Sequence, residues 1–313
     1  MHKKIVILGT GGTIAGTAQN ESDHLGYVPA QVGIGELIEA IPALRAASPL
    51  VEQLAQIDSK DMSFAVWTRL AVRVAHFLAQ DEVQGIVITH GTDTLEETAY
   101  FLQAVLAPSK PVVLTCAMRP ATALMADGPQ NIVDAVAVAR YAGANGVVAV
   151  CAGTIHSAHE VQKVHSYQLN AFGSGDAGPI GYVEQGNLRL VRNWPQAEVG
   201  RSLAAIEKIA KLLPSAWPRV EILMSYAGAD GAVVRALVHQ GVQGLVVAAT
   251  GNGTVHQALE AALLEAQAAG VRVLRASRCL NGRVFKSDTD LLPDAQGLSP
   301  VKARIALMLE LMG

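Results

Sequence analysis

The sequence predicts an α/β protein of two domains: a larger N-terminal domain with a parallel-type sheet wound with helices, and a smaller C-terminal α/β domain. Short apolar runs of strand length alternate with longer segments of helical period, which is the pattern of βαβ units. The 313 residues exceed the size at which one hydrophobic core keeps growing, which favours two domains. Half of the residues are apolar and only 4% are aromatic, which suits close packing of helices on a buried sheet.

The alternation of strands and helices is clear up to about residue 152. Each expected strand is a run of apolar, often β-branched residues, and each expected helix has apolar residues at helical spacing. We expect strands at residues 5–8, 51–57, 83–89, 112–116 and 147–151, and helices near residues 35–41, 64–79, 95–106 and 131–141.

The domain boundaries follow from where this pattern fades and resumes. Residues 1–191 form the predicted N-terminal domain; its last part, 152–191, reads as a rim rather than core, with a hairpin turning at Gln185-Gly186-Asn187. Residues 192–218 hold three prolines and a short helical stretch at 202–213, and are predicted to be a linker. The βα pattern resumes in 219–313, which ends in a helix capped by Ser299.

Charge and cysteine usage exclude several classes of function. The net charge of −3 provides no basic field for nucleic acid and no single-sign patch for a membrane surface. Cys116, Cys151 and Cys279 form no Cys-x-x-Cys pair and read as reduced, mostly buried thiols. The first apolar run is too short for a signal peptide, and no segment approaches a membrane span. We therefore expect a cytoplasmic protein that acts on a small, near-neutral molecule.

The glycine loop "LGTGGTIAG" at residues 8–16 fits neither common phosphate-binding pattern. A dinucleotide fingerprint beginning at Gly9 requires glycine where Ile14 stands, and a Walker loop requires Lys and Ser or Thr where Thr17-Ala18 stand. What remains is a strand that ends in a glycine turn and presents threonines at the carboxyl edge of the sheet, where ligands of α/β folds bind. Taken alone, the loop is better explained as a tight turn whose threonines satisfy backbone groups.

A second strand end carries the same chemistry. Strand 85–89 leads into His90-Gly91-Thr92-Asp93, after which Thr94 opens a helix with Glu97 at the spacing of a capping box. Taken alone, this stretch is also explained if Thr92 and Asp93 are ordinary residues at the start of a helix. Together, the two strand ends predict hydroxyl groups of separate loops at one edge of one sheet.

Both segments resemble the signature segments of the bacterial-type L-asparaginase family, which includes glutaminase-asparaginases. The family implies hydrolysis of L-asparagine to L-aspartate and ammonia, with some L-glutaminase activity, and no cofactor. The resemblance covers essentially the whole chain and extends through "GYVPAQVGIGELIEAIP", "DSKDM", "AMRPATALMADGPQN", "GPIGYV", "GNGT" and "LSPVKAR".

The resemblance also implies the catalytic roles. Thr13 is the nucleophile that forms an acyl-enzyme, and Tyr27 lies against it on the following loop. Thr92, Asp93 and Lys163 form a second cluster of polar residues around a hydroxyl. In this cluster Thr92 orients water, and its backbone N–H helps to hold the oxyanion. Without the resemblance, Lys163 in its polar stretch reads as a solvated surface lysine.

Substrate recognition is where this chain departs from the family. The resemblance assigns Ser59 to the substrate α-carboxylate and Asp93 to its α-ammonium group. The family commonly carries Gln or Glu directly after that serine, whereas this chain has Lys60, which has no acceptor for an ammonium group. As a candidate substrate-binding residue, Lys60 either points away, neutralises Asp61 or serves the carboxylate.

The family further implies a homodimer or homotetramer with sites at the subunit interface. Thr254, in "GNGT", matches a substrate-binding position contributed by the neighbouring subunit. The region that matches the neighbour's glutamate is shorter here and contains no Glu, so Asp288 or Asp290 is the candidate substitute.

Three other interpretations remain. Residues 156–165 come one residue short of a zinc-protease helix because Lys163 occupies the place of the second histidine, so we expect no metal. An ammonia-supplying subunit of a tRNA-dependent amidotransferase resembles the same family but carries an additional N-terminal domain, whereas this chain begins directly at its first strand. A non-catalytic amino-acid sensor would keep the pocket and lose turnover.

Overall fold

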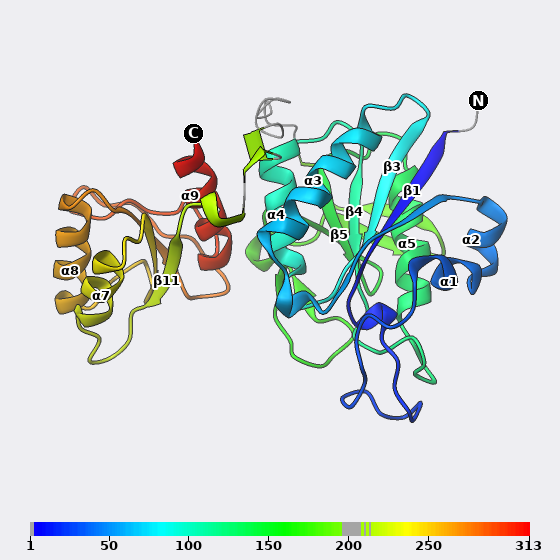
Figure 1. The fold of residues 1–313 in the computed structure, drawn as a ribbon, viewed down its shortest axis with the longest axis horizontal. Helices are drawn as coiled ribbons and strands as arrows, with labels where there is room; N and C mark the ends of the chain where they lie inside the picture. The colour runs from blue at the N-terminus through cyan, green and yellow to red at the C-terminus, as the bar shows by residue number, and fades with distance from the viewer. Residues whose placement is uncertain (1–2, 196–207, 210, 213) are drawn as a thin grey trace. The chain divides into compact units, whose positions relative to one another are not determined.

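The computed structural model describes residues 3–195, 208–209, 211–212 and 214–313 (Figure 1). The chain divides into two compact units, Met1–Lys211 and Leu212–Gly313. Most of the predicted helical stretch at 202–213 lies outside the described residues. Each unit is a sheet flanked by helices, so the α/β class is confirmed.

The first unit is built on an eight-stranded sheet with the order β10-β9-β6-β5-β4-β3-β1-β2. Neighbouring strands are parallel from β5 through β2, and antiparallel from β5 to β10. The strands are β1 (Lys4–Gly11), β2 (Leu50–Ile57), β3 (Val83–Thr89), β4 (Val112–Thr115), β5 (Val147–Cys151), β6 (Thr154–Ser157), β9 (Gly181–Glu184) and β10 (Asn187–Leu190), beside a separate pair of β7 (Gln162–Lys163) and β8 (Phe172–Gly173).

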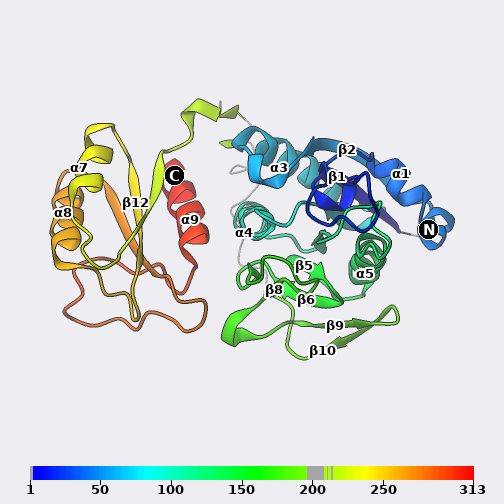
Figure 2. The same ribbon diagram turned by 90° about the horizontal axis from the view of Figure 1, so that it is seen from below.

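Helices cover both faces of this sheet, as Figure 2 shows. α1 (Ile34–Glu39) and α5 (Gly128–Arg140) pack into the same apolar cluster on one face. α3 (Phe64–Leu78) and α4 (Leu95–Leu106) lie on the other, where the rings of Trp67 and Phe101 stack with centroids 4.8 Å apart. With helices on both faces, the central strands are buried, which explains their continuous apolar runs.

Three strands of the segment predicted to be a rim, β6, β9 and β10, instead belong to the main sheet. β6 and β9 extend it, and Ile155, Ile180 and Val183 belong to the core cluster that also holds α1 and α5. β6 (TIHS) and β9 (GYVE) lack the continuous apolar run that identified β4 (VVLT), which is why this core was missed. The predicted hairpin is present between β9 and β10, and the positive φ angles of Gln185 and Gly186 are those of a type I′ turn.

Two predicted helix starts differ in detail. Thr94 precedes α4, but its hydroxyl makes no capping bond and donates instead to the carbonyl of Ser59 at 2.8 Å. The predicted capping hydrogen bond of the Thr94 side chain is therefore wrong. The helix expected near 35–41 ends at Glu39, and α2 (Pro42–Ala47) begins separately because a proline suits the first position of a helix.

The second unit has a three-stranded parallel sheet of order β11-β12-β13, formed by β11 (Val220–Met224), β12 (Gly244–Ala249) and β13 (Arg272–Ser277). α9 (Pro300–Met312) packs against all three strands on one face of this sheet. α7 (Ala232–His239) and α8 (Gln257–Ala268) pack against each other and cover the other face. Ser299 precedes α9 as predicted, but its hydroxyl makes no capping bond.

Cys116 and Cys151 are buried free thiols whose Sγ atoms lie 3.2 Å apart, whereas Cys279 is exposed. Among the described residues, no helix has the length and apolar character needed to cross a membrane. The same residues contain no group of three or more His, Cys, Asp or Glu side chains placed to hold a metal ion.

Candidate active site

The site is formed at the carboxyl ends of three adjacent parallel strands. β3, β1 and β2 are neighbours in the sheet, so the segments that follow them emerge at one edge. Thr92 follows β3, Thr13 follows β1 in a short 3-10 turn, and Ser59 follows β2 in another. Three hydroxyl-bearing loops therefore share the edge at which open α/β sheets bind ligands.

Glycines allow these loops to touch. A Cβ on Gly12 would lie 2.4 Å from the Cα of Gly91, and a Cβ on Gly91 would lie 2.4 Å from the Oγ of Ser59. Gly12 also has φ of 82°, in the region that favours glycine. The backbones after β1 and β3 are thus in direct contact, and the loop after β2 closes on them.

Replacing Gly12 with alanine is expected to lower the free energy of unfolding by about 3 kcal/mol, since the new Cβ would meet backbone atoms and the φ angle disfavours alanine. The measurement is urea denaturation followed by circular dichroism. Gly35→Ala is the matched control, because no atom lies within 4 Å of its added Cβ. In helix α1 this change should leave stability equal or raise it by about 0.5–1 kcal/mol; equal losses in both variants would contradict the loop contact.

Thr13 and Tyr27 form the first polar pair of the site. The Thr13 hydroxyl lies 2.7 Å from the phenol oxygen of Tyr27, and Thr13 is buried. The chain turns back after Thr13, and an antiparallel bridge between Thr17 and Val28, the residue after Tyr27, closes this turn. This bridge returns the tyrosine to the threonine fourteen positions earlier.

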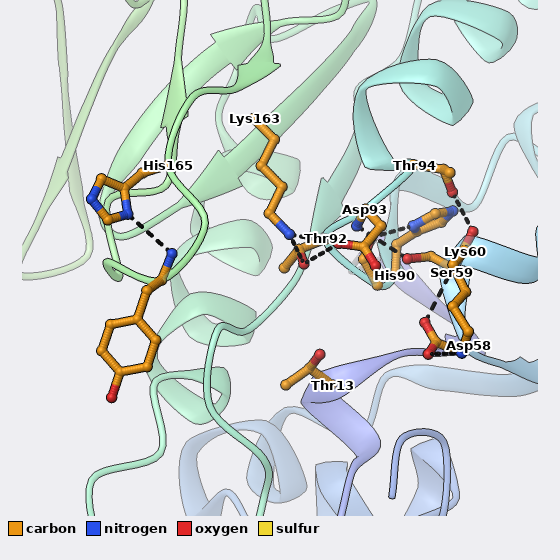
Figure 3. Close-up of polar contacts among 12 residues, drawn as sticks. Thr13, Asp58, Ser59, Lys60, His90, Thr92, Asp93, Thr94, Lys163 and His165 are labelled. Carbon is orange, nitrogen blue, oxygen red and sulfur yellow. Dashed lines mark hydrogen bonds and ion pairs between the residues drawn. The ribbon is translucent and has the colours of Figure 1, made fainter. Parts of the chain in front are cut away.

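Thr92, Lys163 and Asp93 form the second polar group (Figure 3). The Nζ of Lys163 donates to the Oγ1 of Thr92 at 2.8 Å and pairs with the Oδ1 of Asp93 at 2.6 Å. Lys163 lies in β7, which pairs with β8, so the lysine comes from a short sheet separate from the one that carries the threonines. Its ammonium group occupies one oxygen of Asp93 and one lone pair of Thr92.

Ser59 connects the second group to the loop after β2. Its Oγ accepts a hydrogen bond from the backbone N–H of Asp93 at 3.1 Å, and its carbonyl accepts the bond from Thr94 described above. Ser59 is buried, and a hydroxyl that accepts one bond still has a hydrogen to donate. An anionic oxygen in the cavity is the acceptor that this hydroxyl suits.

These groups surround one cavity of about 220 Å³. That volume lies below the range of drug-sized pockets and suits a ligand of amino-acid size. Both threonines that we expected to share a cleft line it, together with the lysine amine. The residues that line the cavity are Thr13, His24, Leu25, Tyr27, Asp58, Ser59, Thr92, Asp93, Met118, Lys163, Ser166 and Tyr167.

Comparison with known proteins identifies the family. Residues 4–196 match the model described as "Asparaginase, N-terminal", and residues 219–312 match that of the "Glutaminase/Asparaginase C-terminal domain". The chain belongs to the asparaginase family. The matched residues leave only the segment between the two models and a few terminal residues uncovered.

Individual members of the asparaginase family match over nearly the whole chain. L-asparaginase 2 of Bacillus subtilis is 37% identical over 98% of this chain and 82% of its own length. A glutaminase-asparaginase of Pseudomonas fluorescens is also 37% identical, over 98% of this chain and 86% of its own length. The crystal structure of a probable cytoplasmic L-asparaginase from Campylobacter jejuni, 40% identical, superposes with a TM-score of 0.90 and covers 99% of this chain and 95% of that one.

Lys60, the departure from the asparaginase pattern, is not among the residues that line the cavity. Its Nζ pairs with the Oδ2 of Asp58 at 2.6 Å and lies 3.6 Å from Asp61. The main partner, Asp58, was absent from the three arrangements that the sequence suggested. The Lys60 side chain is 62% exposed, so its charge lies at the outer side of the loop.

Thr254 and the two candidate aspartates belong to the second unit. The Thr254 hydroxyl lies 2.8 Å from that of Thr250, in the turn after β12. Asp290 is engaged within its own unit, since its carboxylate pairs with Arg275 and accepts the backbone N–H of Ser287 at 2.7 Å. Asp288 is exposed.

The sequence missed half of the cavity lining. Asp58 directly precedes Ser59, so its position beside a predicted ligand-binding residue was the available signal. His24 and Tyr167 come from loops far apart in the chain, and the His24 Nδ1 lies 3.3 Å from the Tyr167 hydroxyl. No spacing or motif in the sequence relates these two loops.

His90 lies directly beneath this site and gives folding a pH dependence. It is fully buried, its Nδ1–H donates to the Gly91 carbonyl at 2.7 Å, and burial lowers the pKa of its imidazole to about 4. The ring is therefore neutral in the folded protein, whereas in the unfolded chain it takes up a proton below about pH 6.5.

We expect this difference to remove about 2 kcal/mol of unfolding free energy between pH 8 and pH 5, because only the unfolded state gains the proton in that range. Urea denaturation at both pH values should show a smaller loss for His90→Gln than for the wild type. His76→Gln, at an exposed position of the same unit, should retain the wild-type loss. An unchanged loss in His90→Gln would contradict the assignment.

Proposed function

We propose that this chain hydrolyses L-asparagine to L-aspartate and ammonia through an acyl-enzyme on Thr13, with some L-glutaminase activity. The observation that carries the proposal is the single cavity lined by both threonine hydroxyls and the Lys163 amine. Hydrolysis of a carboxamide requires a nucleophile, a proton path and donors for the oxyanion, because the amide is a weak electrophile and ammonia a poor leaving group. This cavity offers all three.

The first half-reaction belongs to Thr13 and Tyr27. The Thr13 Oγ1 attacks the carboxamide carbon, and the Tyr27 hydroxyl, 2.7 Å away, is the group that guides the proton of the threonine. The backbone N–H of Thr92 stabilises the oxyanion. The C–N bond then breaks, ammonia leaves with the transferred proton, and an aspartyl ester remains on Thr13.

The second half-reaction belongs to Thr92, Lys163 and Asp93. The Thr92 hydroxyl accepts from Lys163 at 2.8 Å and donates over a long contact of 3.5 Å to the Asp93 Oδ1, so its remaining lone pair can accept a hydrogen bond from a water molecule and orient it. Asp93 holds the lysine in this position through its ion pair. Attack of the water on the ester releases L-aspartate and restores the Thr13 hydroxyl.

The two charges of the substrate are bound on the side of Ser59 and Asp93. The Ser59 hydroxyl donates to the α-carboxylate, and the Asp93 carboxylate binds the α-ammonium group. Support comes from their contact, since the backbone N–H of Asp93 bonds the Ser59 Oγ at 3.1 Å and so keeps the two groups adjacent. One methylene changes discrimination by only about 1–3 kcal/mol, so some activity on L-glutamine is expected.

Assembly and location extend the same proposal. Residues 1–191 carry the chemistry, 192–218 form a linker, and 219–313 contribute Thr254 to the site of a neighbouring subunit in a homodimer or homotetramer. Support for this role comes from the family model of the glutaminase/asparaginase C-terminal domain, which matches residues 219–312 and so includes Thr254. Cytoplasmic location is supported by the similar Campylobacter jejuni protein, titled a probable cytoplasmic L-asparaginase.

The test is an assay of ammonia release from L-asparagine, L-glutamine and D-asparagine. We expect the highest kcat/KM on L-asparagine and a lower value on L-glutamine. Tight binding of L-asparagine without any release of ammonia would instead indicate a sensor. Ultracentrifugation of the active sample tests the assembly, because full activity of a monomer would contradict a shared site.

A further inference from the structure

The cavity contains a second carboxylate besides Asp93. Asp58 lines the same cavity, and its side chain is 25% exposed. Both aspartates adjoin Ser59 (Figure 3). Asp58 precedes it in the chain, and the backbone N–H of Asp93 donates a hydrogen bond to the Ser59 hydroxyl. Two carboxylates therefore flank the hydroxyl that the proposed function assigns to the α-carboxylate of the substrate.

Asp93 alone has limited capacity for an ammonium group. Its Oδ1 is occupied by Lys163 at 2.6 Å, which leaves one carboxylate oxygen for the ligand. A primary ammonium group has three N–H donors and is bound best when several acceptors surround it. The Asp58 carboxylate is a further acceptor on the wall of the same cavity.

Lys60 restrains this second carboxylate. Its Nζ pairs with the Asp58 Oδ2 at 2.6 Å from the exposed side of the loop, and Lys60 itself does not line the cavity. The hydrogen bond that Lys60 donates to Asp58 raises the pKa of Lys60 above its ordinary value, so the lysine is charged at neutral pH. A cation on one oxygen of Asp58 weakens the attraction of that carboxylate for a second cation.

We propose that Asp58 is a second recognition group for the α-ammonium of the amino-acid ligand, and that Lys60 sets its strength by holding it from outside the cavity. This inference rests on the proposed function for the identity of the ligand. Asp58 touches the ligand, whereas Lys60 is a positioning residue that acts through Asp58. The chain thereby retains amino-group recognition although a lysine follows Ser59.

The test compares the binding of L-aspartate and succinate, which differ in the α-ammonium group, by isothermal titration calorimetry. The ratio of their dissociation constants, Kd of succinate over Kd of L-aspartate, isolates recognition of the ammonium group. Asp58→Asn removes the charge but keeps a good helix cap, since the Asp58 side chain accepts the backbone N–H of Lys60. Lys60→Met removes the restraining cation at similar length.

Asp61→Asn is the matched control. It makes the same change of charge in the same 3-10 turn, but Asp61 is 70% exposed and does not line the cavity. We expect Asp58→Asn to lower the ratio about tenfold, as for a lost charge-assisted hydrogen bond. Lys60→Met should raise the ratio about threefold, and Asp61→Asn should change it less than twofold, since exposed charges interact weakly through water.

The double variant Asp58→Asn/Lys60→Met tests whether Lys60 acts through Asp58. We expect its ratio to equal that of Asp58→Asn alone, because the lysine then has no carboxylate to restrain. Equal effects of Asp58→Asn on both ligands, the same drop in Asp61→Asn, or a wild type that binds neither ligand would overturn the inference.

Binding is measured without turnover, so this result is separate from the ammonia assay. A wild type that releases no ammonia but shows the expected ratios would overturn the proposed reaction and leave the recognition role intact. A wild type that releases ammonia while Asp58→Asn leaves the ratio unchanged would overturn only the recognition role.

Discussion

Thr13→Ala is expected to lower kcat for ammonia release from L-asparagine by about 10⁴-fold, because removing a nucleophile leaves only the contributions of the oxyanion donors and of binding. Binding of L-aspartate should change less than about threefold, since Thr13 is not assigned to either charge of the ligand. Ammonia assays stopped at fixed times measure kcat, and calorimetry on the same preparation measures the Kd of L-aspartate.

Thr10→Val is the matched control for the nucleophile. Thr10 lies in the same glycine loop, is equally buried, and donates to the carbonyl of Thr89 at 2.9 Å rather than lining the cavity. This variant should lose about 1–3 kcal/mol of stability from the unsatisfied carbonyl and keep kcat within tenfold. Thr13→Ala with more than a tenth of wild-type kcat would show that another group attacks the amide.

Lys163→Met is expected to lower kcat by about 10²-fold, because the Thr92 hydroxyl that orients the water loses the donor that holds it in position. The change removes the donor to Thr92 and leaves the Asp93 carboxylate without its partner. L-aspartate should bind equally or more tightly, because the freed Asp93 oxygen becomes available to the ammonium group. The split between kcat and Kd distinguishes this result from general damage to the fold.

Lys4→Met makes the same chemical change at the exposed start of β1 and should leave kcat within twofold. A kcat of Lys163→Met within tenfold of the wild type would contradict a role of the amine in the reaction. So would weaker binding of L-aspartate accompanied by an unchanged kcat.

The parallel half of the first sheet was predictable because its strands carry their own signals. β3, β5 and α4 have the predicted bounds, since β3 and β5 are mostly apolar runs and α4 has apolar residues at helical spacing. In the antiparallel half, only the β9–β10 hairpin was predicted; the place of β6 in the main sheet was missed because its sequence, TIHS, has no continuous apolar run and its pairing with β9 joins residues 154 and 182. Strand pairing of that kind leaves no local period.

The two threonines of the site were predictable from the strand ends, whereas Tyr27, Ser59 and Lys163 were predicted only through the family resemblance. Thr13, Ser59 and Thr92 follow adjacent parallel strands, so their proximity follows from the strand order. The hydrogen bond of Thr94 to the Ser59 carbonyl arises only once the loops are in contact, and it replaces the local capping bond that the sequence pattern suggested.

Lys60 illustrates the same limit for charges. The sequence showed that a cation follows Ser59, but its partner depends on how the 3-10 turn at Ser59–Asp61 orients the preceding aspartate. The turn directs Lys60 to Asp58, two residues earlier, more closely than to the adjacent Asp61. Neighbouring positions in a sequence do not reveal which of two carboxylates a flexible lysine contacts.

Trapping the acyl-enzyme with hydroxylamine tests the central claim most directly. During turnover of L-asparagine, hydroxylamine should compete with water for the aspartyl ester on Thr13 and yield the aspartyl hydroxamate in place of part of the L-aspartate. We predict hydroxamate from the wild type and none from Thr13→Ala. Continued release of ammonia by the wild type without any hydroxamate would contradict a threonine ester and with it the assignment of Thr13.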